Sequence, residues 1–66
     1  MRYEIRVAGL MGEITLHEGF PELEGVFVPN QTILYGQVTD EAHLYGLLNR
    51  FQALGLRVTE LRQLPD

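Results

Sequence analysis

The 66-residue sequence contains no cysteine, serine, lysine or tryptophan. Without cysteine, no disulfide supports the core and no thiolate is available to a structural zinc site. The two histidines, His17 and His43, lie far apart, and neither has a second histidine three or four positions away. We therefore expect no metal site and no cofactor. Without serine or cysteine, neither a Ser-His-Asp triad nor a Cys-His pair can be assembled, which makes an enzyme the least favoured class.

Positive charge is also scarce in this chain. Nine acidic residues oppose five basic ones, all of them arginine, and the net charge is −4. This charge repels a polyanion, so we expect no nucleic-acid partner. No apolar run approaches the roughly 18 residues of a membrane span, and Met1 to Glu4 leads directly into a strand-like pattern rather than a signal peptide. The default expectation is a cytoplasmic protein with no membrane association.

The chain length predicts one domain over residues 1–66, because so short a chain cannot bury two cores. Below about 70 to 80 residues, a single core rarely supplies more than roughly 3–5 kcal/mol of stability. Proteins of this size often add disulfides, metals or oligomerisation, and the composition leaves only oligomerisation. We therefore expect self-association, with a separate protein partner as the other option.

The segment from Thr39 to Leu56 carries the clearest structural pattern, that of an amphipathic helix. Asp40 is placed to cap its first turn, and Gly55 can adopt the left-handed conformation that ends a helix. Gly46, inside this helix, is expected to allow close approach of the sheet or of a second chain. Five apolar residues fall on one stripe at helical spacing and predict the face that packs on the core: Leu44, Leu47, Leu48, Phe51 and Leu54.

Four strands are predicted around this helix. Tyr3 to Val7 alternates apolar and charged residues with the period of two that a half-buried strand requires. Residues 23–28 and 32–38 flank the turn dipeptide Pro29-Asn30 and predict a hairpin. Residues 56–62 alternate at first and then break phase, which indicates a bulge or an exposed end in the last strand.

The window over residues 10–20 is ambiguous. Residues 13–17 alternate as a strand would, but Leu10, Ile14 and His17 also share a helical face. A helix here gives the order βαββαβ, a two-layer α+β ferredoxin-like fold with a four-stranded antiparallel sheet. A strand gives a meander with one helix. Periodicity leaves both options open, and the topology favours the helix.

Two parts of the chain resemble known sequences. The first is the start Tyr3-Glu4-Ile5-Arg6-Val7, and the second contains Asp-x-Ala-x-Leu-x-Gly-Leu-Leu-x-Arg at residues 40–50 and Leu-Gly-Leu at residues 54–56. Together they resemble a group of short bacterial proteins that carry no assigned activity. The resemblance covers roughly half of the chain and departs where those proteins usually have a tryptophan-bearing helix after the first strand. It implies the architecture and brings no substrate, cofactor or catalytic residue.

The strand over residues 32–38 places apolar side chains on both faces of the sheet. If Leu34, Gly36 and Val38 face the helices, Ile33 and Tyr35 point to the opposite face, which a two-layer fold leaves open. An apolar patch on an open sheet face is typical of an interface. This strand therefore predicts where a partner binds.

Phe27 is expected to extend this patch, because it has the opposite parity to Val26 and Val28. RNA-binding sheets of similar topology also display aromatic residues on this face, but with basic residues around them. This chain instead has Glu4, Gln37 and only Arg6 nearby. The candidate interface residues are Phe27, Ile33 and Tyr35.

Other polar residues are weaker candidates for chemistry. His17 and Glu18 are adjacent, so their side chains diverge and do not form a general-base pair. His43 lies in the first turn of the main helix, where an ordinary surface histidine is the favoured interpretation. Glu22 and Glu24 would share one face of a strand and could bind a cation or an arginine, but the polar face of an edge strand is favoured. No catalytic residue is assigned.

The sequence therefore favours a noncatalytic protein that acts through association, as a homodimer that uses its open sheet face. The alternative is a small-ligand-sensing regulatory domain with its site at the dimer seam, an analogy at the level of the fold. An enzyme ranks third, because its site would have to form between subunits.

Overall fold

The computed structural model describes residues 1–65 as four strands and two helices. Along the chain they are β1 (Arg2–Ala8), α1 (Glu13–Gly19), β2 (Glu24–Val28), β3 (Gln31–Gln37), α2 (Glu41–Ala53) and β4 (Val58–Leu64). The ambiguous window over residues 10–20 therefore contains a helix rather than a strand. Neither helix is long and apolar enough to span a membrane.

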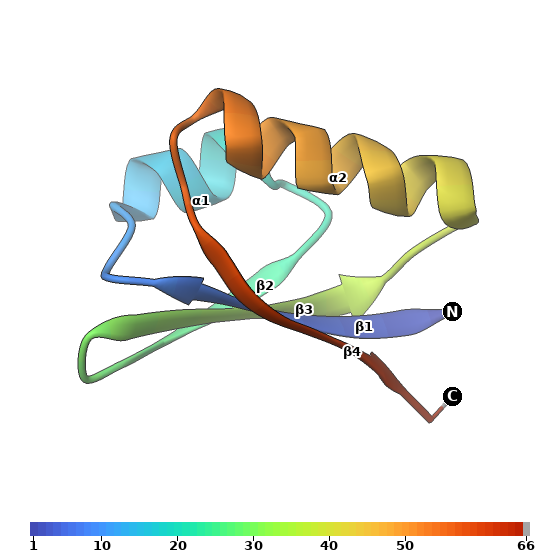
Figure 1. Cartoon of the computed structure of the whole chain (residues 1–66), viewed down its shortest axis with the longest axis horizontal. Helices are drawn as coiled ribbons and strands as arrows, with labels where there is room; N and C mark the ends of the chain where they lie inside the picture. The colour runs from blue at the N-terminus through green and yellow to red at the C-terminus, as the bar shows by residue number, and fades with distance from the viewer. Residues whose placement is uncertain (66) are drawn as a thin grey trace.

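The four strands form one antiparallel sheet in the order β2-β3-β1-β4. Figure 1 shows both helices on one face of this sheet, while within residues 1–65 no helix covers the other face, which we call the open face. The structure confirms the predicted two-layer ferredoxin-like α+β fold. β2 and β4 are the edge strands, and within residues 1–65 each pairs on one side only.

Helix α1 is short, and contacts from the sheet hold its start in place. The buried Thr32 hydroxyl on β3 donates to the Gly9 carbonyl (3.0 Å) and accepts from the Met11 backbone N–H (3.1 Å). This pair of hydrogen bonds fixes the loop between β1 and α1 against the sheet. Leu16 is the buried residue of α1, and Gly25 on β2 leaves room for it, because a Cβ at position 25 would lie 2.5 Å from Leu16 Cδ2.

The turn between β2 and β3 consists of Pro29 and Asn30, as predicted. Asn30 adopts a left-handed backbone conformation (φ 62°), which asparagine tolerates better than most residues. Val28 on β2 pairs directly with Gln31 on β3, so the turn has two residues. This short turn fixes the register of the whole hairpin.

Helix α2 begins and ends as its sequence predicts. The Asp40 carboxylate accepts a hydrogen bond from the His43 backbone N–H (2.9 Å), and Gly55 takes the left-handed conformation (φ 72°) after the last turn. The prediction that Leu54 belongs to the core is wrong, because α2 ends one residue earlier and Leu54 is 51% exposed. The rest of the predicted stripe faces the core: Leu44, Leu47 and Phe51 are buried and Leu48 is half-buried.

Gly46 does not bring α2 close to the sheet. Among residues 1–65, a Cβ at this position would find no atom within 4 Å beyond its own stretch of helix. The expected approach to the sheet is therefore wrong, and the approach of a second chain stays a prediction.

The core lies between the helices and the sheet. Phe20, directly after α1, stacks on Phe51 of α2 with ring centroids 4.2 Å apart, and both rings are fully buried. The two aromatic rings thereby join the end of α1 to α2. The other buried apolar side chains are Ile5, Val7, Met11, Leu16, Leu23, Leu34, Val38, Leu44 and Leu47.

Strand β4 contains the bulge that its broken phase predicts. Val7 pairs with Val58 and Arg6 pairs with Glu60, so Thr59 is an extra residue on β4. The Thr59 hydroxyl donates to the Arg6 carbonyl oxygen (3.3 Å). After the bulge, residues 60–64 pair with β1 in regular register.

Candidate functional site

Two predicted interface residues lie on the open face. Directly paired residues on neighbouring antiparallel strands point to the same face of a sheet. The buried Leu34 pairs with Ile5 under the helices, so Ile33 and Tyr35 point to the open face, where both are half-buried. Ile33 also pairs with Val26 of β2, which is 44% exposed. We call Val26, Ile33 and Tyr35 the open-face patch.

Phe27 does not belong to this patch, and its predicted orientation is wrong. It pairs with the buried Thr32, which pairs in turn with Val7 under the helices. Phe27 therefore lies on the helix side of β2, where it lines a hollow beside α1. Residues 26–28 are all apolar, so alternation does not mark their faces. The two-residue turn does show which face each residue occupies, because it pairs position 27 with position 32 and position 26 with position 33. It therefore identifies Val26 as the open-face residue that the sequence prediction missed.

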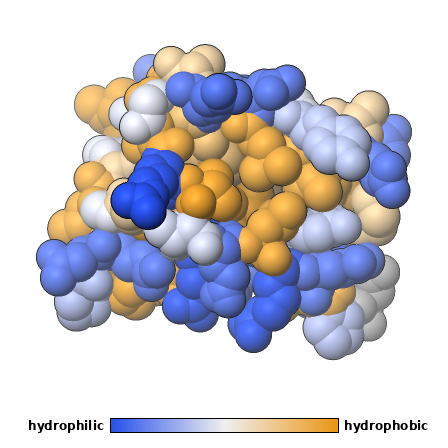
Figure 2. Space-filling view, viewed as in Figure 1, coloured by the Kyte–Doolittle hydropathy of each residue, from blue (hydrophilic) through white to orange (hydrophobic). Residues whose placement is uncertain are grey.

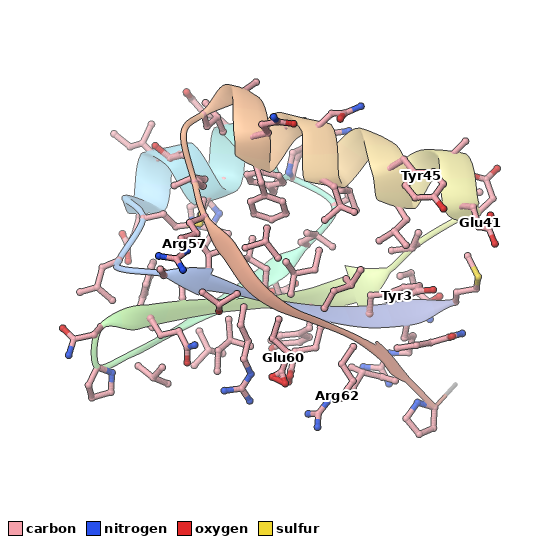
Figure 3. All side chains as sticks on the ribbon, in the orientation of Figure 1. Tyr3, Glu41, Tyr45, Arg57, Glu60 and Arg62 are labelled. Carbon is pink, nitrogen blue, oxygen red and sulfur yellow. The ribbon has the colours of Figure 1, made fainter. Side chains whose placement is uncertain are left out.

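The half of the open face over β1 and β4 is charged. Glu4 accepts hydrogen bonds from Arg6 Nε (3.2 Å) and from Arg62 Nη2 (3.1 Å). Arg6 Nε also lies 3.5 Å from a carboxylate oxygen of Glu60. Figure 3 shows Glu60 and Arg62 below the sheet, on the side away from the helices. Because these four charges cancel, this half of the face is not a basic platform for a polyanion.

A second polar cluster joins the loop between α1 and β2 to α2. Arg50 Nη1 donates to a Glu22 carboxylate oxygen (2.9 Å) and to the Gly19 carbonyl (3.2 Å). The other Glu22 oxygen accepts from His43 Nε2 (3.1 Å), whose Nδ1 accepts from the Thr39 backbone N–H (3.0 Å). The Arg50 hydrogen bond lowers the pKa of Glu22 to about 2, although partial burial acts in the opposite direction.

This second cluster fastens a loop and is not arranged for proton transfer. Both ring nitrogens of His43 already make hydrogen bonds within the chain, whereas a general base needs a free acceptor within reach of a substrate proton. Glu22 does bind an arginine, as one interpretation of the sequence allowed, but Glu24 takes no part because it pairs with Tyr35 on the open face. The partners of Glu22 lie 21 and 28 positions away, so local spacing does not predict the cluster.

Of the remaining polar candidates, His17 and Glu24 line the hollow beside α1 together with Glu13, whereas Glu18 does not. His17 and Glu18 are exposed side by side on α1. Among residues 1–65, no three His, Asp or Glu side chains lie close enough together to hold a metal ion.

An apolar hollow of about 420 Å³ lies between the end of α2 and β4. Figure 2 shows apolar side chains gathered between α2 and β4 on this side of the molecule. Leu61 shares the helix side of β4 with Val58, because these residues pair with the buried Ile5 and Val7. The apolar surface therefore extends along β4, which is an edge strand. The lining residues of the hollow are Leu48, Phe51, Gln52, Gly55, Leu56 and Val58.

Comparison with known proteins identifies a family without an assigned activity. Residues 2–62 match the family described as Domain of unknown function (DUF8691), and the chain belongs to that family. No match was found among the curated proteins or among the solved structures. Because the family description names no substrate, cofactor or partner, the function has to be argued from the surfaces described above.

Proposed function

We propose that this protein is noncatalytic and acts through association, as a homodimer that packs the open faces of two sheets together. The observation that supports the proposal is the open-face patch, three apolar side chains on a face that no helix covers. A two-layer fold with apolar residues on its uncovered face gains stability when another layer covers them. A second copy supplies that layer without any further partner.

A twofold axis through the open-face patch would bring the same three side chains of both copies into contact. Full burial of an apolar side chain contributes roughly 1.5–3 kcal/mol, and these side chains gain less because they are already partly buried. The gain must also exceed the cost of association. We therefore expect a reversible dimer with a dissociation constant in the micromolar range.

The register of the sheet identifies substitutions that place a charge in the open-face patch without destabilising the isolated sheet. Tyr35 pairs with Glu4 and with Glu24, so Tyr35→Arg places a guanidinium between two carboxylates. Ile33 pairs with Arg6, so Ile33→Glu places a carboxylate opposite an arginine. Both substitutions favour the isolated sheet and oppose the packing of a second apolar patch on it.

The test is the molar mass in solution, measured by light scattering at micromolar concentration. We expect the wild type to have the mass of at least two chains, where one chain is 7.5 kDa. Tyr35→Arg and Ile33→Glu should each halve the mass and leave the far-UV circular dichroism unchanged. Gln37→Glu is the matched control, because Gln37 is exposed at the end of β3 opposite Arg2, and it should leave the mass unchanged. A one-chain wild type, or a mass indifferent to both patch substitutions, contradicts the proposal.

The second candidate function is the small-ligand-sensing regulatory domain. The shallow, open hollow between α2 and β4 favours a site within one chain rather than at the dimer seam, because its lining offers apolar contacts and one polar side chain, Gln52. Thermal denaturation with a panel of small apolar compounds tests it. A ligand at 100 times its dissociation constant adds about 2.7 kcal/mol to the free energy of unfolding. A panel without any stabilising compound would leave association as the supported function.

A further inference from the structure

The outer edge of β4 has a sequence that is complementary to itself. We propose that β4 pairs with β4 of a second copy, antiparallel and centred on Leu61, so that two four-stranded sheets join into one. This contact uses a sheet edge rather than the open-face patch, so it goes beyond the homodimer proposed above.

The register centred on Leu61 matches the side chains of the three residues nearest the twofold axis, residues 60–62. Glu60 lies opposite Arg62 of the second copy, and Arg62 lies opposite Glu60 of the second copy, all on the open face. Leu61 meets Leu61 of the second copy on the helix side. Cross-strand pairs of opposite charge and of apolar side chains both stabilise a sheet. The seam therefore contains two ion pairs around one apolar pair.

These pairs continue a charge pattern that already exists within one chain. Glu4 of β1 pairs with Arg62, and Arg6 of β1 pairs with Glu60. Across the joined sheets, one row reads Glu4 and Arg62 of one copy, then Glu60 and Arg6 of the other. The signs alternate along the whole row, so Glu60 lies between two guanidinium groups and Arg62 lies between two carboxylates.

The neighbouring registers lack this complementarity. A shift by one residue places the helix side of one β4 beside the open side of the other. The nearest shifts that keep the faces matched place Glu60 opposite Glu60, or Arg62 opposite Arg62, of the second copy. Like charges directly opposite one another are destabilising. The charges therefore select the register centred on Leu61.

The other edge of the sheet offers no such match. β2 carries one charge, Glu24, and no cation, so no register pairs opposite charges between two copies of it. Pairing centred on Val26 would place Glu24 against Val28 of the second copy. Self-pairing is therefore favoured at β4 over β2.

The helix side of the proposed seam is apolar. Leu61 is 40% exposed and lies on the same side of β4 as Val58, which lines the hollow next to α2. A second copy at this edge would place its own Leu61 against the first and cover part of the apolar surface seen in Figure 2. It would also pair the hydrogen-bonding groups on the free edge of β4. The contact thus covers an exposed edge and an apolar surface together.

The absence of cysteine makes the register directly testable. Leu61→Cys would place two thiols opposite each other at the twofold axis, where Cα atoms lie about 4.5–5.5 Å apart, within the range that a disulfide bridges. Gln63→Cys is the matched control, because position 63 would lie opposite Thr59 of the second copy, and its two thiols would lie roughly 13 Å apart. We expect a disulfide-linked dimer of Leu61→Cys on a non-reducing gel, formed at least about tenfold faster than with Gln63→Cys. Equal rates, or no dimer of Leu61→Cys, would overturn the inference.

Exchanged charges test the same seam without a covalent bond. Glu60→Arg and Arg62→Glu each create two like-charge pairs between identical copies, whereas a mixture of the two variants restores opposite charges in both pairs. In the Tyr35→Arg background, which removes the open-face contact, each variant alone should have the mass of one chain and the equimolar mixture the mass of two. Recovery on mixing separates the seam from the contacts that Glu60 and Arg62 make within their own chain. Single variants that dimerise, or a mixture that does not, would overturn the register.

The experiments can overturn the edge contact and the open-face contact independently of each other. A mass halved by Tyr35→Arg without a Leu61→Cys dimer supports the open face and overturns the edge. A Leu61→Cys dimer with a mass indifferent to Tyr35→Arg supports the edge and overturns the open face. A protein that makes both contacts has the mass of four chains if the two twofold axes intersect at right angles, or a larger mass if they do not, and in either case Tyr35→Arg reduces it to the mass of two chains.

Discussion

Replacing glycine by alanine should raise the stability at Gly46 and lower it at Gly25. Gly46 lies inside α2, and in the described part of the chain an added Cβ finds no atom within 4 Å beyond its own stretch of helix. Alanine there gains helix propensity and restricts the unfolded chain without a steric cost, which contributes about 0.5–1 kcal/mol. In a domain this small, 1 kcal/mol shifts the melting temperature by about 4–8 °C. We expect a rise of a few degrees for Gly46→Ala.

At Gly25 the same substitution should lower the stability instead, because the surroundings leave no room for a Cβ. An added Cβ would lie 2.5, 3.0 and 3.3 Å from the Cδ2, Cδ1 and Cγ atoms of Leu16. The whole end of the Leu16 side chain would have to move, and it is 5% exposed in the core. Overpacking of this kind costs about 1–3 kcal/mol. Gly25→Ala should therefore lower the melting temperature by at least about 4 °C.

Equilibrium urea denaturation, followed by far-UV circular dichroism, measures both changes. All variants should be compared at one protein concentration, because self-association makes stability depend on concentration. With an unchanged slope, a shift in the midpoint reports the free energy of unfolding. A Gly46→Ala variant less stable than the parent would refute the reasoning at that site and indicate that a second chain packs on α2. A Gly25→Ala variant as stable as the parent would show that Leu16 moves aside at no cost.

Two further stability predictions follow from the core and from the loop cluster. Phe51→Ala should cost about 3–5 kcal/mol and leave little folded protein, because it removes a fully buried ring that stacks on Phe20. Leu54→Ala, at an exposed position three residues later, should cost less than about 1 kcal/mol, and equal losses would contradict the core assignment. Glu22→Gln should cost about 1 kcal/mol of stability near neutral pH. The cost stays low because water screens the ion pair with Arg50, in which the Glu22 side chain is 29% exposed. Because the folded pKa of Glu22 is lowered from 4.5 to about 2, its contribution is complete above pH 4.5 and is lost as the pH falls towards 2, so the urea midpoints of parent and variant should converge over that range.

The sequence predicts those parts of the fold whose signals are local. Asp40 and Gly55 mark the two ends of α2, because a cap and a left-handed glycine act within one turn of the helix. The orientation of Ile33 and Tyr35 follows from the alternation along β3, where a buried residue lies between them. The helix over residues 13–19 follows only from topology, because its periodicity fits both structures.

The features that the sequence predicted wrongly or missed are mostly set by residues that lie far apart in the sequence. The faces of Val26 and Phe27 depend on pairing through the turn, not on the local run of apolar residues. The Glu22 cluster depends on packing the loop before β2 against α2. Leu54 fits the helical spacing, but the helix ends before it, and spacing alone does not fix a helix boundary within a residue or two.

The net charge of the chain is distributed unevenly, and this distribution bears on how copies meet. The register places three arginines and three glutamates on the open face: Arg2, Arg6, Arg62, Glu4, Glu24 and Glu60. These charges cancel, so the net charge of −4 comes from the rest of the chain. Contacts through the open face or through the β4 edge therefore join neutral strands. Contacts through the remaining surface would bring together the regions that carry the excess negative charge of each copy, which Coulomb repulsion opposes.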